Sequence, residues 1–462
     1  MKTLLFLYLF IISVYSFATD KFLDTCISIA VKRNKKLLAK EEEIKLAEKQ
    51  LWATTRNFFP SIFLQHRYSR GKAGKEDSPE EYQAEDRWIR LYQPIYDGGR
   101  LSAAHKYYSH ALELAKIDYI RLKEELKYKI KVAYYEYISS VLEMKETEKL
   151  LSEINDYYNK LTSEYLAKAI SELELQEGKV FKQKIENFYQ KAKKNMILYQ
   201  NKLLMLVGIK SLDEIIYDIP FDVLTSLPKE IDYDLEQLKN LLTINNPDLK
   251  KLRLNMKMAE EKKKIVVAKV RPKFYFEGSY GQSGEAYVAE PLKLATVWVG
   301  MLRLSWLFGG SSLESSYQKE KTIPREILDV SQRIDATILD TKLGLFDDIK
   351  YFVDKKEADT TMIYTEAEYQ ETEKLLMLEL EKFYHQYYYS LIDAKVAYDD
   401  LELKKWHLEV SKKKNLLYEV STLEVMGNIY KVSEALLTYS KALLQNYIAV
   451  AELEKLVLIP LR

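Results

Sequence analysis

The chain has few of the residues that interrupt helices. Its 462 residues include only 14 glycines and 10 prolines, against 70 basic and 69 acidic residues. A low content of helix breakers, with many Leu, Glu, Lys and Tyr, favours very long helices. A globular protein of this length would instead form two or three ordinary domains.

The chain also lacks an excess of charge and a second cysteine. The formal net charge is +1, so no bulk attraction to nucleic acid is expected. The single cysteine, Cys26, excludes an intramolecular disulfide and a multi-cysteine metal cluster. We find no phosphate-binding loop, no nucleophile motif and no metal-ligand spacing among the five histidines. We therefore expect no enzyme activity, no cofactor and no metal.

The first residues have the pattern of an export signal. Lys2 supplies the positive start, residues 4–14 supply an apolar segment, and residues 16–18 supply small side chains at the cleavage positions. We expect residues 1–18 to be removed, with the mature chain beginning near Thr19. Lipidation of Cys26 is not expected, because charged residues separate it from the apolar segment.

Residues recur along the chain at fixed separations, which predicts two internal repeats. Separations of 212 relate Asn34 to Asn246 and Pro60 to Pro272 (272 − 60), and the two Gly-Gly pairs lie 211 apart. Further on, "ISELEL" at 170–175 and "VSTLEV" at 420–425 lie 250 apart. The second repeat therefore carries about 39 extra residues (250 − 211) after its Gly-Gly pair.

Each repeat is predicted to contain a helix, two strands and two long helices. The first repeat covers 19–207, with strands at about 61–70 and 87–96 and long helices at about 100–165 and 171–207. A linker covers 208–236. The second repeat covers 237–462, with strands at about 273–282 and 295–307. The extra residues fall within 311–371, contain Pro324, and are otherwise helical in composition. We expect them to fold back beside the long helices.

The long helices predict an antiparallel coiled coil. Residues 101–165 contain no breaker and would extend roughly 100 Å at about 1.5 Å per residue. A globular core does not accommodate such a rod. A heptad seam runs along Leu151, Ile154, Tyr158, Leu161 and Tyr165.

The strands have the length and the aromatic spacing of membrane strands. No apolar run after residue 18 reaches the roughly 18 residues of a spanning helix, so membrane contact must use strands or a surface. Trp298 and Trp306 share one strand face and lie roughly 26 Å apart, the spacing of two aromatic girdles. A soluble sheet with a core-facing apolar side explains the same pattern.

The two Gly-Gly pairs are predicted to form strand-to-helix corners. Gly98-Gly99 and Gly309-Gly310 each follow an alternating apolar stretch and precede a long helical one. Glycine tolerates the positive φ and the close backbone approach that such a corner needs. This interpretation is architectural and not catalytic.

Several motifs, in order and duplicated, resemble the TolC-type outer-membrane channel family. "QPIYDGG" (93–99) and "SWLFGG" (305–310) are similar to the family's entry to the long helix. "YLAKAISELEL" (165–175) and "YEVSTLEVM" (418–426) are similar to its helical tips. "LLMLVG" (203–208) and "NNPDL" (245–249) are similar to the close of its first half and the opening of its second.

The resemblance implies a fold, partners and a location. The fold class would be mainly α with a membrane β-barrel contribution: a helical coiled-coil barrel in the periplasm and four strands per protomer, twelve in a homotrimer. The protein would be the exit duct of a tripartite efflux pump or a type I secretion system in a Gram-negative outer membrane. Its partners would be outer-membrane lipid, a periplasmic adaptor and an inner-membrane pump of RND or ABC type. An independent argument supports oligomers, because four strands cannot close a barrel and open edges are not tolerated in lipid.

The resemblance also implies roles for the tips. Glu424 and its repeat counterpart Glu174 would be acids of a periplasmic gate, and a solvated helix face is the competing interpretation. Contacts with the adaptor would come from Tyr165, Lys168, Ser171, Tyr418 and Ser421. Lys168 stands where the family usually has glycine, and the second tip reads as about three residues shorter than the first.

A different class of protein fits part of the same pattern. An exported coiled-coil scaffold or adhesin with a small β-tip, attached peripherally and without a pore, would also need long helices and a few strands. The cargo, and the choice between a proton-driven pump and an ATP-driven transporter, are left open by the sequence.

Overall fold

The structure is a computed structural model that describes residues 21–75, 78–212, 227–287, 291–323 and 335–461. The expected export signal, residues 1–18, and the middle of the expected linker lie outside these ranges. The chain divides into two compact units. A helical unit comprises the residues up to Lys40, Asp118–Leu249 and those from Thr372 onward, and a sheet unit comprises Glu41–Ile117 and Lys250–Glu371.

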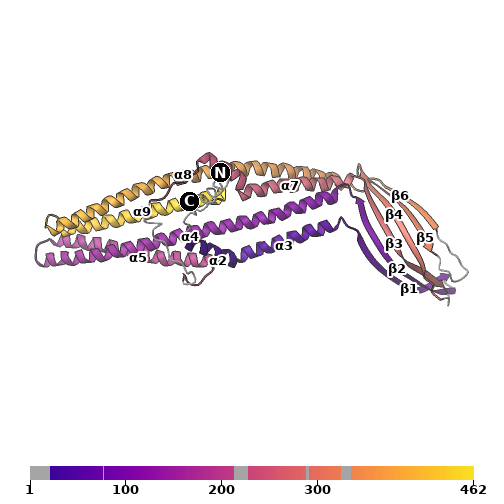
Figure 1. Cartoon of the computed structure of the whole chain (residues 1–462), viewed down its shortest axis with the longest axis horizontal. Coiled ribbons are helices and arrows are strands. Elements are labelled where there is room, and N and C mark those ends of the chain that lie inside the picture. Colours follow the sequence, from indigo (N-terminus) through magenta and orange to yellow (C-terminus); the bar gives the residue numbers. More distant parts are fainter. Residues whose placement is uncertain (1–20, 76–77, 213–226, 288–290, 324–334, 462) are drawn as a thin grey trace, which may run out of the picture. The chain divides into compact units, whose positions relative to one another are not determined.

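The helical unit contains two shorter helices and most of two helical hairpins, whose long first helices begin in the sheet unit. α4 (Arg100–Leu166) is followed by α5 (Glu172–Val207), and α8 (Lys350–Leu416) is followed by α9 (Thr422–Val457). Within each hairpin the two helices run side by side in opposite directions (Figure 1). The shorter helices are α2 (Lys21–Arg33) and α6 (Leu235–Asn245).

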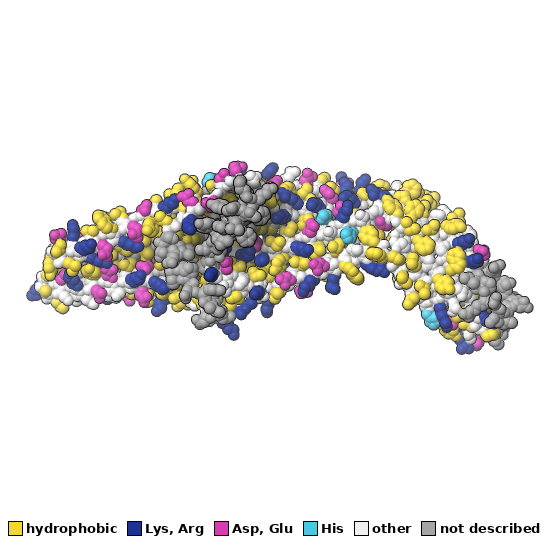
Figure 2. All heavy atoms as spheres, in the orientation of Figure 1, with side chains coloured by type: hydrophobic (Ala, Val, Ile, Leu, Met, Phe, Trp, Pro, Cys, Tyr) yellow, Lys and Arg dark blue, Asp and Glu magenta, His cyan; other side chains and the backbone are white. Residues whose placement is uncertain are grey.

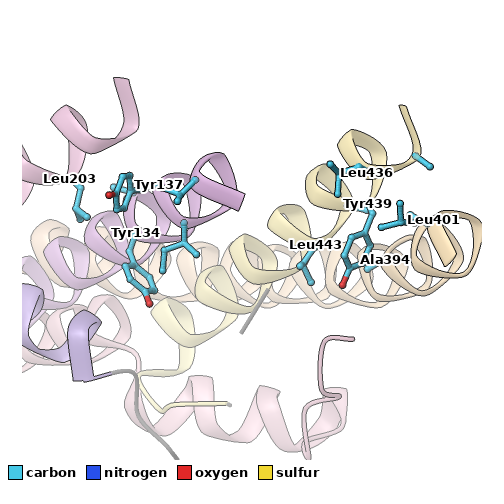
Figure 3. Close-up of a cluster of buried hydrophobic side chains, with 14 of the residues drawn as sticks. Tyr134, Tyr137, Leu203, Ala394, Leu401, Leu436, Tyr439 and Leu443 are labelled. Atoms are coloured by element: carbon cyan, nitrogen blue, oxygen red, sulfur yellow. The ribbon is translucent and has the colours of Figure 1, made fainter. Parts of the chain in front are cut away.

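The core of the helical unit centres on α9. Of the 36 residues in α9, 19 are buried, whereas α5 has the same length and buries only 5. Figure 3 shows the core in two groups of side chains: Tyr134, Tyr137 and Leu203 in one, and residues of α8 and α9, among them Leu401, Tyr439 and Leu443, in the other. From the predicted heptad seam, Ile154 is fully buried and Leu161 is 1% exposed. Burial of this apolar surface is the main favourable contribution to the fold.

The sheet unit contains one antiparallel sheet of six strands in sequence order (Figure 1). The strands are β1 (Ser61–Lys75), β2 (Ser78–Tyr96), β3 (Lys273–Tyr287), β4 (Ala295–Phe308), β5 (Ser311–Ile323) and β6 (Asp335–Gly344). Helices α3 (Lys35–Arg56) and α7 (Pro247–Val267), and the 3-10 turn η4 (Ala268–Val270), precede β1 and β3. The strand count differs from the four strands that we predicted.

The prediction that the extra residues are helical is wrong. They form β5 and β6, which pair with β4 and with each other in continuous antiparallel register. The segment 311–323 contains Glu, Lys and Gln, which are common in helices, and this composition concealed a strand alternation. Leu313 and Tyr317 point to one side of β5, and Glu314 and Ser316 point to the other. A twelve-stranded assembly of three chains therefore no longer follows from the strand count.

The interpretation of Gly309 and Gly310 as a strand-to-helix corner is also wrong. Phe308 pairs with Ser311, so the two glycines form a two-residue hairpin loop between β4 and β5. Their φ angles are 59° and 83°, and positive φ at both positions is the property of the type I′ turn that matches the twist of a hairpin. Gly98 and Gly99, by contrast, lie between β2 and α4, with φ angles of 72° and 91°.

The second long helix begins after β6 instead of after β4. Asp347 lies in the connection that leads into α8, 250 residues (347 − 97) after Asp97, which lies in the connection that leads into α4. The carboxylate of Asp97 accepts a hydrogen bond from the Leu101 N–H at 2.8 Å. The strand-to-helix corner of the second half is therefore displaced from the Gly-Gly pair by one β-hairpin.

Candidate functional site: the sheet face and the helical tips

One face of the sheet carries an exposed band of apolar side chains, which we call the apolar face. Paired residues of antiparallel strands point to the same side of a sheet, so the register assigns each residue to a face. The apolar face carries Ile62, Leu64, Ile89, Leu91, Phe274, Phe276, Tyr280, Trp298, Leu302, Leu304, Trp306, Leu313, Tyr317, Leu339 and Leu343.

Eleven of these fifteen side chains are exposed, and Leu91, Trp298, Leu304 and Leu313 are half-buried. Leu64 is 81% exposed and Leu339 is 72% exposed, although they lie on β1 and on β6 at opposite edges. Figure 2 shows hydrophobic side chains gathered over the strands. A contiguous exposed apolar surface of this kind marks contact with a membrane or with another protein.

The opposite face, which we call the polar face, carries charged and hydrogen-bonding side chains among its aromatics. The carboxylate of Glu277 lies 3.4 Å from the guanidinium of Arg303 on the neighbouring strand. Ser283 donates a 2.7 Å hydrogen bond to Asp86 across β2 and β3. From β1 to β6, the sheet thus has one face with a band of apolar side chains and one face of mixed polar and aromatic side chains. The apolar face also carries charged residues: His66, Glu85, Arg87, Lys319 and Lys321.

The two tryptophans predicted to form a girdle lie on the apolar face. Trp298 is opposite Tyr280 of β3, and Trp306 is opposite Leu313 of β5. The indole N–H of Trp306 donates to the carbonyl oxygen of Val270 at 3.1 Å, and this bond fixes the end of β4 to η4. Contact of Trp298 and Trp306 with lipid stays a prediction.

In the helical unit, the two hairpin tips have the same geometry. Lys168 follows α4 with a φ of 56°, and Tyr418 follows α8 with a φ of 60°. The N–H of Ala169 donates to the Glu164 carbonyl at 2.9 Å, and Glu419 donates to Lys414 at 3.0 Å in the corresponding place. Both helices therefore end in one left-handed turn of equal length. The expectation of a shorter second tip is wrong.

The acids predicted to form a gate follow these turns, but they have different local environments. In α5, Ser171 caps the helix by accepting from the Glu174 N–H, and the Glu174 carboxylate accepts from the Ser171 N–H at 2.7 Å. This backbone bond and the Ser171 hydroxyl lower the pKa of Glu174. In α9, Ser421 accepts from the Glu424 N–H at 3.1 Å, and the Glu424 side chain is exposed. Glu174 therefore has a capping role that Glu424 does not share.

Side chains from three helices hold the tips together. The Thr422 hydroxyl donates to Glu164 of α4 at 2.6 Å, and Lys160 donates to Asn415 of α8 at 2.7 Å. Gly178 of α5 permits close packing, because an added Cβ would lie 2.3 Å from a methyl carbon of Leu161. The tips are thus fixed by polar bonds and by a glycine contact.

Exposed leucines surround the predicted tip contact Tyr418, and sequence reasoning missed them. Tyr418 is 91% exposed. Four leucines beside the tips are 68–76% exposed: Leu166, Leu173, Leu416 and Leu417. Their positions beside the tip motifs were visible in the sequence. Their exposure was not, because a leucine next to a helix terminus can also pack in a buried hydrophobic staple.

Across the described residues, no helix combines the length and the apolar character needed to cross a membrane. The same residues include no group of three or more His, Cys, Asp or Glu side chains able to hold a metal ion.

Comparisons with known proteins find likeness in structure and not in sequence. No protein-family model and no curated protein matches the chain. A membrane protein from Pseudomonas aeruginosa aligns with a TM-score of 0.73 at 14% identity, covering 96% of this chain and 91% of that one. The CmeC outer membrane channel of Campylobacter jejuni aligns with a TM-score of 0.68 at 14% identity, covering 94% and 85%.

The outer membrane protein VceC from Vibrio cholerae aligns with a TM-score of 0.70 at 13% identity, covering 94% of this chain and 95% of that one. The likeness thus extends over nearly the whole of both chains. The chain has the fold of these membrane proteins, two of which are outer-membrane proteins, and the resemblance to the TolC type is confirmed at the level of the fold. At 13–14% sequence identity, this likeness shows a shared fold only.

Proposed function

We propose that this protein is the outer-membrane channel of a tripartite efflux system, a passive duct across the periplasm and the outer membrane. The amphipathic sheet carries this proposal, because it has an apolar face open for lipid and a polar face suited to a water-filled lumen. The long helical hairpins would continue the duct into the periplasm. The energy for export would come from the inner-membrane pump.

A single chain cannot complete the barrel. Its six-stranded sheet is smaller than the roughly eight strands of the smallest membrane barrels, and unpaired strand edges are not tolerated in lipid. Copies must therefore share one wall. We propose a homotrimer. The resemblance to TolC-type channels implies three copies, and the fold supplies long helices for a tunnel and a partial sheet for the wall.

The helical tips would serve as the gate and as the docking surface for the adaptor. Glu424 of each copy would face a narrow axis, where like charges repel one another and attract cations, as in other acidic selectivity rings. Tyr418 and the leucines around it would contact the periplasmic adaptor.

The gate has a charge-selective test. Glu424→Gln removes the charge and keeps the size, and we expect it to reduce block by divalent cations in single-channel recordings. Glu174→Gln is the matched control, because the Glu174 carboxylate holds its helix cap and is not part of the ring proposed here, and Gln at this position preserves the capping box. Equal block in wild type and Glu424→Gln would remove Glu424 from the gate.

Membrane fractionation separates the duct from a peripheral scaffold, the competing class. The duct should sediment with the outer membrane, resist extraction at alkaline pH, and migrate as an oligomer that heating dissociates. A scaffold would be released by alkali and would migrate as a monomer. Release into the soluble fraction would overturn the proposal.

A further inference from the structure

We propose that the β5–β6 hairpin is part of the pore wall, so that each copy brings six strands and three copies enclose eighteen. This inference rests on the proposed channel function and deepens it. The consequence is a wider outer mouth than twelve strands would give.

The hairpin is an integral part of the sheet. The pairing of β4 with β5 runs without interruption from Phe308↔Ser311 to Thr296↔Ile323. The pairing of β5 with β6 runs from Ser312↔Gly344 to Lys321↔Asp335. The hairpin therefore extends the ladder along nearly the full length of β4, which a flap attached at one end would not do.

The hairpin has a two-sided chemistry in the half that lies next to Gly310, whereas its other half carries Lys319, Lys321 and Asp335 on the apolar face. Leu313 and Tyr317 of β5 and Leu339 and Leu343 of β6 lie on the apolar face, and Leu339 is 72% exposed. On the polar face, Glu314 is opposite Lys342. A hairpin that plugged the lumen or lay in water would gain nothing from an exposed apolar side. One lipid-facing side and one water-facing side is what a wall segment needs.

Because the hairpin adds two strands, copies of the sheet can still close into one antiparallel barrel. With six antiparallel strands, the edge strands β1 and β6 run in opposite directions. When β6 of one copy pairs with β1 of the next, the antiparallel alternation continues around a ring. One added strand would break this alternation, and two added strands keep it. The occupant of the β6 edge is therefore β1 of a second copy, which also satisfies the backbone groups in lipid.

The inference predicts a measurable change in pore size. Barrel diameter grows roughly linearly with strand number, so the loss of a third of the strands would narrow the mouth by about a third and its cross-section by about half. The connection between strand and helix indicates where to cut. Deletion of residues 309–346 joins Phe308 to Asp347, in the order in which Tyr96 precedes Asp97 in the first half.

The experiment compares wild type and the deletion variant in planar bilayers, with neutral polyethylene glycols of graded size added on the sheet side only. Polymers added there sample the β-mouth and not the helical tips. We expect the deletion to lower the size of the largest polymer that enters the outer mouth by about a third. An unchanged cutoff in a variant that still conducts would overturn the hairpin assignment alone. Absence of conductance in wild type would overturn the channel function itself.

Disulfide trapping in the full-length chain keeps the inference testable if the deletion variant does not assemble. In a Cys26→Ser background, Ile62→Cys on β1 is combined in turn with cysteine at three β6 positions of the apolar face: Leu339, Thr341 and Leu343. The matched control combines Ile62→Cys with cysteine at three β4 positions of the same face: Leu302, Leu304 and Trp306. We expect intermolecular disulfides only with the β6 set. Disulfides only with the β4 set, or with neither, would overturn the pairing of β6 with β1.

Discussion

Replacement of Asn246 by alanine should destabilise the helical unit more than the same change at its sequence counterpart, Asn34. Asn246 is 2% exposed, and its side-chain oxygen accepts from the N–H groups of Asp248 and Leu249 at 2.9 and 3.2 Å. This bonding caps α7. Its amide nitrogen also donates to the Leu456 carbonyl of α9 at 3.1 Å, a buried bond.

Asn34 makes the same cap without the second bond. Its side-chain oxygen accepts from the N–H groups of Lys36 and Leu37 at 2.9 and 3.2 Å and so caps α3. Loss of a cap costs about 1 kcal/mol, the expected effect of Asn34→Ala. Asn246→Ala loses a cap and also leaves a buried carbonyl without its partner, which adds about 1–3 kcal/mol. The total loss at Asn246 should be about 2–4 kcal/mol.

Denaturant unfolding of the detergent-solubilised protein, followed by circular dichroism, measures both losses in free energy of unfolding. Wild type and both variants should show equal slopes against denaturant, so that midpoints report stability. Equal losses at the two asparagines would refute the reasoning, because they would show that the bond to Leu456 contributes nothing beyond the cap.

Two further perturbations test the corner and a buried acid. Gly98→Ala should lower the free energy of unfolding by about 2–4 kcal/mol, because the added Cβ would lie 2.6 Å from the Ala268 carbonyl oxygen at a position with positive φ. Gly309→Ala should cost only about 1 kcal/mol, because Gly309 has positive φ but no heavy atom within 4 Å of the added Cβ. Thermal unfolding that ranks the two variants in the other order would contradict this. Burial raises the pKa of Glu143 above 4.5, although the Ser440 hydroxyl donates a hydrogen bond to its carboxylate. The folded state therefore holds the proton more tightly than the unfolded state, and the free energy of unfolding falls as pH rises from about 4.5 through the folded pKa. Glu143→Gln should remove this loss, so its stability relative to wild type should increase from pH 4 to pH 7.5, and a constant difference would be the contrary result.

Much of the fold was predictable because its signals are strong over long segments. Helices without breakers and the alternation in 273–280 both point to structures that the chain forms. Glu174 three residues after Ser171 is the sequence signature of a capping box, and the structure forms that box. Such local rules need no tertiary context.

The β5–β6 hairpin was not predictable by the same means. A strand with one face in lipid and one in water gives a weak periodic signal, and the charged residues of β5 read equally well as helix. Two adjacent glycines fit both a type I′ hairpin and a strand-to-helix corner, because both need positive φ. Only the pairing of Phe308 with Ser311 decides between them.

The most direct test of the central claim is the behaviour of the purified full-length protein in planar lipid bilayers. The account predicts a detergent-dependent oligomer that inserts in discrete steps, each step adding one uniform conductance. A monomer that stays in solution without detergent and leaves the bilayer current unchanged would contradict it.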